Sequence, residues 1–449
     1  MNSSSADSLL TRLEDALREA LREWGGRPVF IGLSGGMDSM LLLECLAAMS
    51  DIAPRLTAIH VHHGLNADAD EWQALCERRC DALNIPLIKE RVQVQTSGKG
   101  VEAAARDARY SAFEQRLPTD AVLLTAHHAS DQAETLLLRL FRGSGLKGLR
   151  GIPSQRLLSG RDSGNTDKRV ILRPWLDFRR ADLFLAAETL GVDWAEDSSN
   201  DDESFDRNWL RHSQIPELTA RYPSLEKTLV RTARHLADDY LLLQTLLQPV
   251  YDAAMTECQW ASTGKYCLSV AELARQPSRV RFHLLSYWLE QNQVDVPETG
   301  SLMHWLNQCL TAAPDRQPLL LSGEFRLQRH RQHLYVWSEQ STPDTVNEVP
   351  ATWGRGSIRL RDDETASMPV IPPHYELRPA KLCTDVRLRP EGRPAQRLKN
   401  IWQETGVPPW LREHWPVLLR SGEPVALLGL MNDRSVKCEL VDILRLEWL

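Results

Sequence analysis

Cysteine is sparse in this chain, with eight residues among 449 and no CxxC pair. A structural zinc site or a disulfide framework needs a denser pattern, so the sequence argues against both. The closest pair, Cys76 and Cys80, lies four residues apart in the stretch EWQALCERRCDAL. That spacing predicts one face of a helix.

Long apolar runs are also missing. No stretch approaches the roughly 20 uninterrupted apolar residues that span a bilayer. The N-terminal stretch MNSSSADSLLTRLEDALREALREW mixes acids and bases on a helical pattern. It has neither the basic start nor the apolar centre of a signal peptide. We therefore expect a cytoplasmic protein.

The chain also lacks an excess of positive charge. The formal net charge is −7, with 53 Lys and Arg against 60 Asp and Glu. A chain of this charge is not a general binder of polyanions. Any nucleic-acid partner must therefore be held by a local basic patch.

Short apolar runs alternate with amphipathic stretches in the N-terminal half. The runs that predict strands are VFIGLS (29–34), LTAIHVHHGL (56–65), IPLIKERVQV (85–94) and AVLLTAHH (121–128). The stretches that predict helices cover residues 40–49, 69–83, 101–117 and 133–143. This alternation is typical of an α/β fold with a doubly wound parallel sheet. Because ligands bind beyond the carboxyl ends of such strands, we expect the active site at that edge.

The pattern changes along the chain and divides it into four parts. Residues 1–217 form the predicted catalytic domain, and residues 218–340 a mostly helical domain. Residues 341–377 are rich in Pro, Thr, Ser and Asp and predict a linker. Residues 378–449 predict a small α+β domain. The sequence shows no internal repeat and no low-complexity tract.

The stretch SGGMDS after the first predicted strand indicates a phosphate-binding loop. It has glycines and a helix start, which offer backbone N–H donors to an anion, but it lacks the lysine of a Walker loop. A carboxylate there would repel phosphate unless a cation lies between them, so Asp38 is predicted to bind Mg²⁺. The loop suits pyrophosphate as a leaving group. The predicted nucleotide-binding residues are Ser34, Gly35, Gly36, Met37, Asp38 and Ser39.

Two carboxylates stand at the start of the fourth predicted helix. Asp131 and Glu134 are three residues apart, so both point the same way. They could bind an ammonium group, hold Mg²⁺ or accept a proton, or they could simply compensate the helix dipole. His127 and His128 precede them, and we choose His127 as the residue that faces the site.

The loop resembles the SGGxDS signature of the N-type ATP pyrophosphatases, the PP-loop superfamily, whose fold resembles the adenine nucleotide alpha hydrolases. Further segments are similar to the tRNA(Ile)-lysidine synthetases: residues 60–65, 100–110, 125–149, 196–211 and 397–419. That family usually shows HHxDDQxET, whereas this chain has Ser130 at the first acidic place.

The resemblance implies a specific ligase reaction. An enzyme of this family uses ATP and Mg²⁺ to adenylate the wobble cytidine of the tRNA(Ile) with a CAU anticodon. Free L-lysine then displaces AMP, and the product is lysidine. The resemblance assigns catalytic roles to Asp38, Arg106, His127, Asp131 and Glu134. It leaves open how Asp131 and Glu134 divide lysine and metal, which of His60, His62 and His63 approaches ATP, and whether the protein forms a homodimer.

Basic residues in two regions predict RNA contacts. Besides Arg106, Asp131 and Glu134, the predicted substrate-binding residues are Arg139, Arg142, Arg207 and Arg211. Residues 378–449 carry 12 Lys and Arg against 9 Asp and Glu, which reverses the sign of the whole chain. Basic side chains cluster there beside Trp402 and Trp410, a pattern that fits RNA docking. The alternative is that these tryptophans belong to the local core.

Three other functions compete with this interpretation. A tRNA thiolase of the same superfamily activates a base in the same way but delivers sulfur, usually with CxxC cysteines, which are absent here. An amidotransferase-type synthetase needs an ammonia source, and none is visible. A non-catalytic RNA-binding protein would not need an intact SGGMDS and SDQAET.

Overall fold

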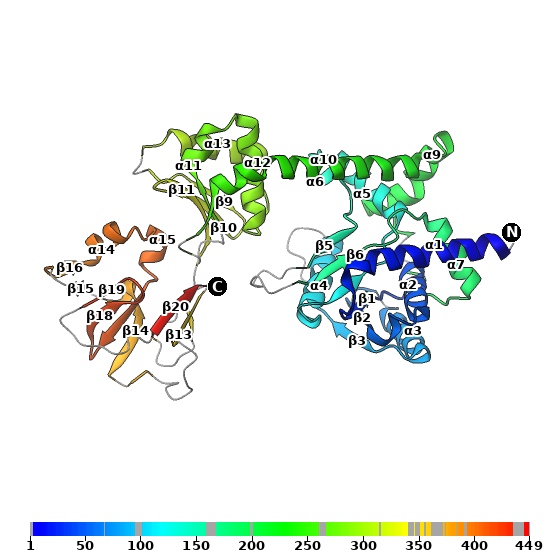
Figure 1. Ribbon diagram of the computed structural model, residues 1–449, viewed down its shortest axis with the longest axis horizontal. Coiled ribbons are helices and arrows are strands. Elements are labelled where there is room, and N and C mark those ends of the chain that lie inside the picture. The colour runs from blue at the N-terminus through cyan, green and yellow to red at the C-terminus, as the bar shows by residue number, and fades with distance from the viewer. Residues whose placement is uncertain are drawn as a thin grey trace. The chain divides into compact units, whose positions relative to one another are not determined.

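The computed structural model separates the chain into two units, Met1–Leu246 and Leu247–Leu449, each with its own sheets and core (Figure 1). It describes residues 3–66, 68–94, 101–158, 168–197, 201–258, 260, 266–313, 316–339, 345, 351–353, 356–360, 371–372, 374–383, 385–389, 393–433 and 444–448. Among these residues, no helix is both long and apolar enough to cross a membrane.

The first unit is built on a six-stranded sheet in the order β3-β2-β1-β4-β6-β5. Its strands are β1 (Val29–Gly32), β2 (Leu56–His62), β3 (Leu87–Arg91), β4 (Val122–Leu124), β5 (Gln155–Leu157) and β6 (Val170–Leu172). All are parallel except β5, which pairs antiparallel with β6 at the edge. The four predicted strands and the α/β fold class are confirmed. Strands β5 and β6 were not predicted, because three residues are too few to show a period.

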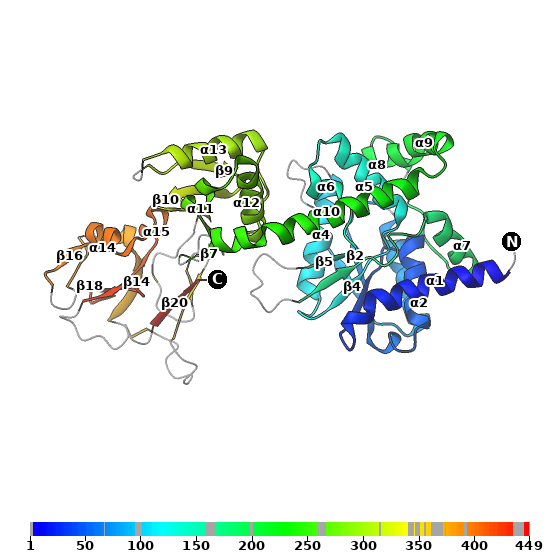
Figure 2. The same ribbon diagram turned by 45° about the horizontal axis from the view of Figure 1, so that its top comes forward.

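Successive residues of the strands pack on opposite faces of this sheet, as the pleat requires. Val29 and Ile31 of β1 belong to one core cluster, and Phe30 between them belongs to another. Helices α1 (Ser3–Leu21), α2 (Met37–Ala48), α3 (Ala69–Leu83) and α7 (Arg180–Leu190) line the first cluster, and α4 (Val101–Arg116) lines the second. Both faces are covered, so the sheet is doubly wound (Figures 1 and 2).

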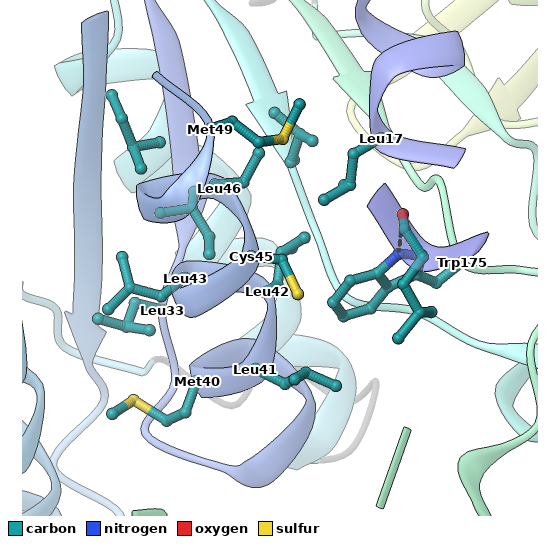
Figure 3. Packing of buried hydrophobic residues seen from close by; sticks show 14 of the residues in the cluster. Leu17, Leu33, Met40, Leu41, Leu42, Leu43, Cys45, Leu46, Met49 and Trp175 are labelled. Carbon is teal, nitrogen blue, oxygen red and sulfur yellow. Dashed lines mark hydrogen bonds between the residues drawn. The ribbon is translucent and has the colours of Figure 1, made fainter. Parts of the chain in front are cut away.

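Helix α2 is apolar on nearly all sides because it lies inside the first cluster. Met40, Leu41, Leu42 and Leu43 are fully buried (Figure 3). The helix packs beside Trp175, whose indole N–H donates to the carbonyl of Leu13 at 3.4 Å. The buried body of α2 fixes the position of its N-terminus, where the SGGMDS loop ends.

The other helices of the first unit follow the strands β4 and β6 or link to the second unit. They are α5 (Ala129–Phe141), α6 (Leu146–Leu149), α8 (Asp206–Trp209), a π-helix (Leu210–Gln214), α9 (Ile215–Arg221) and α10 (Leu225–Ala254). Two 3₁₀ turns cover Arg22–Trp24 and Ala53–Arg55. The helices predicted over 40–49, 69–83, 101–117 and 133–143 are confirmed as α2, α3, α4 and α5. Cys76 and Cys80 are both buried in α3, as the helix-face interpretation predicts.

The second unit begins with helices packed on an antiparallel sheet. The helices are α11 (Val270–Arg275), α12 (Ser278–Gln291) and α13 (Thr299–Thr311). The sheet runs β7 (Met255–Glu257), β8 (Tyr266–Ser269), β11 (His333–Ser338), β10 (Phe325–His330) and β9 (Leu319–Ser322). The helical middle is confirmed, with a five-stranded sheet added to it.

The C-terminal part of this unit has three small sheets. One pairs β14 (Tyr375–Pro379), β17 (Pro416–Arg420), β18 (Glu423–Leu427) and β19 (Met431–Asn432). The others are β12 (Ala351–Trp353) with β13 (Gly356–Leu360) and β20 (Leu444–Trp448), and β15 (Arg387–Leu388) with β16 (Gln396–Arg397). Helices α14 (Leu398–Thr405) and α15 (Pro409–Arg412) and a 3₁₀ turn (Ala380–Leu382) complete it.

The predicted domain boundaries at 217, 340 and 377 stay predictions. Most of the predicted linker, 341–377, lies outside the described residues. Its described residues include β12 and β13.

The burial of α2 predicts a large effect of truncation at its centre. Leu42→Ala is expected to cost about 2–5 kcal/mol, because it leaves a cavity in a packed core. Hydrogen exchange of the α2 backbone amides measures this as a loss of protection. The control is Leu241→Ala on α10, where the side chain is 66% exposed. Equal protection of α2 in the two variants would contradict the packing described here.

Candidate active site

The loop between β1 and α2 is held in shape by its two serines. The backbone N–H of Ser34 donates to Ser39 Oγ at 3.1 Å, and the two hydroxyl oxygens lie 3.0 Å apart. Ser39 Oγ also donates to the carbonyl of Gly36 at 2.9 Å. These bonds fix the loop before any ligand arrives. The N–H of Ser39 also donates to the carbonyl of Gly36 at 3.1 Å. The other N–H groups in the first turn of a helix lack intrahelical acceptors.

Gly35 is the residue that lets the chain turn this tightly. Its φ is +88°, a conformation that strains other residues. An added Cβ would also lie only 3.4 Å from Cβ of Trp72 in α3. The carbonyl of Gly35 accepts a hydrogen bond from the N–H of Ala195 at 2.9 Å, which ties the loop to the segment after α7.

Asp38 and Met37 begin α2, and only Asp38 points a polar group toward other site residues. Met37 is buried in the core, whereas the Asp38 carboxylate is 29% exposed. Its Oδ2 lies 3.6 Å from Nε2 of His128. Its Oδ1 is shielded from solvent and has no hydrogen-bond partner among the described residues. A carboxylate with one oxygen unused fits the ligand role predicted for it.

His128 connects the loop to the start of α5. Its Nε2 lies 3.6 Å from Asp38 and 3.5 Å from Oδ2 of Asp131, and the residue is almost completely buried. The backbone N–H of His128 also donates to Asp131 Oδ2 at 3.0 Å, which caps the helix. Burial opposes a charge on His128, but the carboxylates of Asp131 and Asp38 outweigh it and raise the pKa of the imidazole. The sequence pointed to a histidine pair here but did not single out this one.

Asp131 and Glu134 are paired with two arginines from a later segment. Arg207 donates from Nη2 to Asp131 Oδ1 and from Nε to Glu134 Oε2, each at 2.7 Å. Arg211 donates from Nε to Glu134 Oε1 at 2.7 Å and from Nη2 to Glu134 Oε2 at 3.0 Å. Glu134 is fully buried, so both of its oxygens are satisfied by guanidinium groups alone. The structure thus joins four of the predicted site residues in one charged cluster.

This cluster keeps Asp131 ionised. Burial raises the pKa of Asp131, but the charges of His128 and Arg207 outweigh that effect and hold the pKa well below its usual range. A carboxylate that ionises so readily is a weak base. It binds a cation more readily than it removes a proton.

His127, chosen from the sequence, lies beside the same site in a different chemical state. Its Nδ1 is 3.0 Å from Oγ1 of Thr125. Burial, opposed by Asp131 and reinforced by Arg173 and Arg106, lowers the pKa of His127 to about 3. The imidazole is therefore neutral at physiological pH. Its catalytic role stays a prediction.

The two histidines of β2, His60 and His62, and His63 directly after it contact neighbouring residues. His60 Nδ1 lies 2.9 Å from the carbonyl of Leu33, directly before the loop. His62 Nε2 is 3.3 Å from Asp70, and the guanidinium of Arg109 donates to His63 Nε2 at 3.3 Å. His60 therefore contacts the residue that directly precedes the loop.

The remaining predicted arginines do not join the charged cluster. Arg139 donates to the carbonyls of Gly148 and Gly151, both at 2.7 Å, so it stabilises the segment that follows its own helix, α5. Arg142 is exposed and lies 3.4 Å from Asp206. Arg106 is exposed on α4 and donates to the hydroxyl of Tyr110 at 3.3 Å. Their roles toward RNA or the reaction centre stay predictions.

The chain matches three protein-family models. A PP-loop domain covers residues 9–218, a TilS substrate binding domain covers residues 268–335, and a TilS substrate C-terminal domain covers residues 378–448.

The chain is also similar over most of its length to curated tRNA(Ile)-lysidine synthases. The protein of Vibrio vulnificus (strain CMCP6) is 35% identical over 434 residues, which is 91% of this chain and 94% of the relative. That of Pseudomonas fluorescens (strain Pf0-1) is 36% identical over 97% of this chain and 96% of the relative. The protein of Escherichia coli O157:H7 is 34% identical, with coverages of 90% and 92%.

This chain belongs to the tRNA(Ile)-lysidine synthase family. The resemblance seen in its motifs is thereby confirmed, and the PP-loop match implies that the chain binds ATP. At one position the chain departs from the motif of the lysidine synthases, and the structure shows what the residue at that position contacts. Ser130, at the family's first acidic place, donates its hydroxyl to Glu226 of α10. A carboxylate at that place would face the like charge of Glu226.

The C-terminal aromatics of this lysidine synthase family member serve packing. Trp402 is 6% exposed in a core cluster with Trp415. Trp410 stacks on Trp337 of β11, with ring centroids 5.4 Å apart. The core alternative raised by the sequence therefore holds for both tryptophans. The segment from β15 to α14 carries a predicted RNA-docking patch, which consists of Arg387, Arg389, Arg393, Arg397 and Lys399.

The buried pairing of Glu134 predicts what its removal does. Glu134→Gln is expected to destabilise the cluster by about 3–5 kcal/mol, because two guanidinium groups lose their buried counter-charge. Amides of residues 206–214 should then exchange hydrogen faster. Asp206→Asn is the control, since its exposed pair with Arg142 contributes at most about 1 kcal/mol. Normal protection of residues 206–214 in Glu134→Gln would show that the cluster does not hold this segment.

Proposed function

We propose that this protein joins free L-lysine to C2 of the wobble cytidine in the CAU anticodon of tRNA(Ile), with ATP as the activating substrate. The products are lysidine, AMP and pyrophosphate. The modified base pairs with A instead of G, so the codon changes from AUG to AUA and the amino-acid identity from Met to Ile. One observation carries the proposal: the carboxylates of Asp38 and Asp131 both lie beside Nε2 of His128. The nucleotide loop and the acids of α5 therefore belong to one site.

The first step is adenylation of the base. The wobble cytidine is extruded from the anticodon loop, because chemistry on a base requires access to it. Its C2 carbonyl oxygen forms a bond to the α-phosphorus of ATP, and the bond from that phosphorus to pyrophosphate breaks. The N–H groups of residues 34–39 and the start of α2 stabilise the charge that collects on pyrophosphate.

The residues present fit Mg²⁺ at Asp38. Among the described residues no group of three or more His, Cys, Asp or Glu side chains is placed to hold a metal ion. Mg²⁺ needs no such cage, since it is usually bound by one or two carboxylates together with substrate phosphates and water. The unused Oδ1 of Asp38 supplies that carboxylate. When bound, the ion would neutralise charge on the departing pyrophosphate.

The second step is the attack of lysine on the adenylated base. Near Asp131 and Glu134 the ε-ammonium group first loses a proton to water. The resulting amine nitrogen forms a bond to C2, the bond from C2 to the former carbonyl oxygen breaks so that AMP leaves with that oxygen, and the excess proton on the nitrogen passes to water. Asp131 and Glu134 are the counter-charges for the incoming ammonium group, which shares them with Arg207 and Arg211. His127 is neutral, and we assign it a contact with the adenylated base.

The arginines of the cluster suit the phosphate of AMP. Arg207 and Arg211 are held by buried carboxylates, so their donors are fixed in position before the reaction. Fixed guanidinium donors are effective partners for charge that develops on a phosphate. We therefore keep their predicted role in substrate binding and assign it to the α-phosphate. Arg139 and Arg142 remain proposed RNA contacts.

The competing functions receive no support from the site. A thiolase would need reactive cysteines near the loop, but burial raises the pKa of the Cys76 thiol to about 12 and that of Cys80 to about 11. Such thiols are inert. A purely RNA-binding protein would not need the serine-braced loop or the free oxygen of Asp38. A homodimer stays a prediction.

Lysine incorporation tests the proposal directly. The protein, ATP, Mg²⁺ and labelled lysine are incubated with a transcript of the CAU-anticodon tRNA(Ile). We expect label in the RNA and one AMP for each lysine incorporated. A transcript with G in place of the wobble cytidine is the matched control and should take up none. Label-free RNA, or transfer of sulfur instead, would overturn the assignment.

The role of Asp38 is tested by a nearly isosteric change. Asp38→Asn is expected to lower AMP formation by about 100-fold or more, the usual effect of removing one group that stabilises transition-state charge. Raising Mg²⁺ should not restore the rate. The control is Asp51→Asn, where the side chain is exposed and pairs only with Arg18. AMP formation at the normal rate in Asp38→Asn would contradict the mechanism.

A further inference from the structure

Three arginines gather around the side chain of Tyr110 in the first unit. Arg106 lies one turn earlier on α4, Arg156 lies in β5, and Arg173 directly follows β6. The hydroxyl of Tyr110 accepts hydrogen bonds from Arg106 and from Arg173, each at 3.3 Å. The guanidinium carbons of Arg106 and Arg156 each lie 5.1 Å from the centre of the tyrosine ring.

This group has cations but no acidic partner. In the part of the chain that the structure describes, none of the three arginines forms an ion pair with a carboxylate. Arg173 is 3% exposed, and its Nε has no hydrogen-bond partner among the described residues. Folded proteins rarely leave a buried donor unused, and gathering three like charges costs free energy. An anion that these donors receive would account for both features.

The arginine group lies at the active-site edge of the sheet. Strand β6 is the neighbour of β4, and the N–H of Thr125 donates to the carbonyl of Leu172 at 3.1 Å. Arg173 thus stands next to the segment that carries His127. Arg173 and Arg106 are close enough to lower the pKa of that imidazole.

The group is set apart from the loop that holds the nucleotide. The loop follows β1 and Arg173 follows β6, with β4 between them. Adjacent strands are about 4.8 Å apart, so the two strand ends are separated by about 10 Å. One phosphate cannot reach both places. Arg106 and Arg156 are exposed, so the anion can approach from solvent.

We propose that Tyr110, Arg106, Arg156 and Arg173 form a second phosphate site, which binds a backbone phosphodiester of the RNA substrate beside the extruded nucleotide. Holding the backbone there fixes the position of the base, because phosphate contacts set register while other groups act on the base. Tyr110 positions the guanidinium groups through its hydroxyl and ring. The site rests on the proposed function, since it assumes an RNA substrate.

Arg156→Ala tests this site, because Arg156 is exposed. The binding of labelled tRNA(Ile) transcript is measured without ATP over a range of salt concentrations. We expect binding to weaken about tenfold, as for the loss of a charged hydrogen bond. The slope of log affinity against log salt should fall by about 0.7, the value for one contact to single-stranded RNA. The KM for ATP should stay unchanged.

Two further variants separate charge from packing. Arg156→Lys keeps the charge, so its salt slope should match that of the unmodified protein. Arg116→Ala is the matched control on α4, because Arg116 is exposed but pairs with Glu90. It should leave both affinity and slope unchanged.

Other outcomes would overturn the inference. A raised KM for ATP with normal RNA binding would assign the arginines to the phosphates of ATP. Unchanged values for both would make the group a structural one only. Because binding is measured without turnover, a failure of lysine incorporation does not affect this test.

Discussion

The ion pairs of Glu134 with Arg207 and Arg211 hold the active-site edge of the first unit together. A carboxylate with no access to water is stable only if its charge is compensated, and here two guanidinium groups do so. Both arginines come from residues 206–214, which therefore lie over α5 instead of in solvent. Arg207 also donates to Asp131, and Asp131 lies beside His128, which in turn contacts the loop after β1.

The loop and the cluster prepare the site in different ways. Residues 34–39 are fixed by hydrogen bonds between serines and backbone, so their N–H groups need little reorganisation when pyrophosphate forms. The cluster instead fixes charges, with acids and arginines that restrain each other. A lysine ammonium that approaches this cluster meets Asp131, whose pKa is held low and whose carboxylate is therefore already ionised.

Net charge alone would not have suggested a protein that handles RNA. The chain carries −7 overall, yet the arginines around Tyr110 and the bases of residues 378–449 are gathered locally. Acidic residues elsewhere limit unspecific binding to polyanions, and we assign the attraction for phosphate to these local groups. The tryptophans beside the basic residues of the C-terminal domain pack against Trp337 and Trp415, in agreement with the core alternative raised by the sequence.

The sequence by itself determined the parallel sheet, the loop at Asp38 and the reaction class, because period, glycine placement and short motifs are local properties. It also identified Asp131, Glu134, Arg207 and Arg211 individually. Only the tertiary structure decided that these four belong to one cluster, that His128 rather than its neighbour bridges two carboxylates, and that Arg156 and Arg173 converge on Tyr110. These facts depend on contacts between strands and helices far apart in the chain. Three-residue strands such as β5 and β6 carry too little pattern to predict such contacts, and their pairing is set by the sheet as a whole.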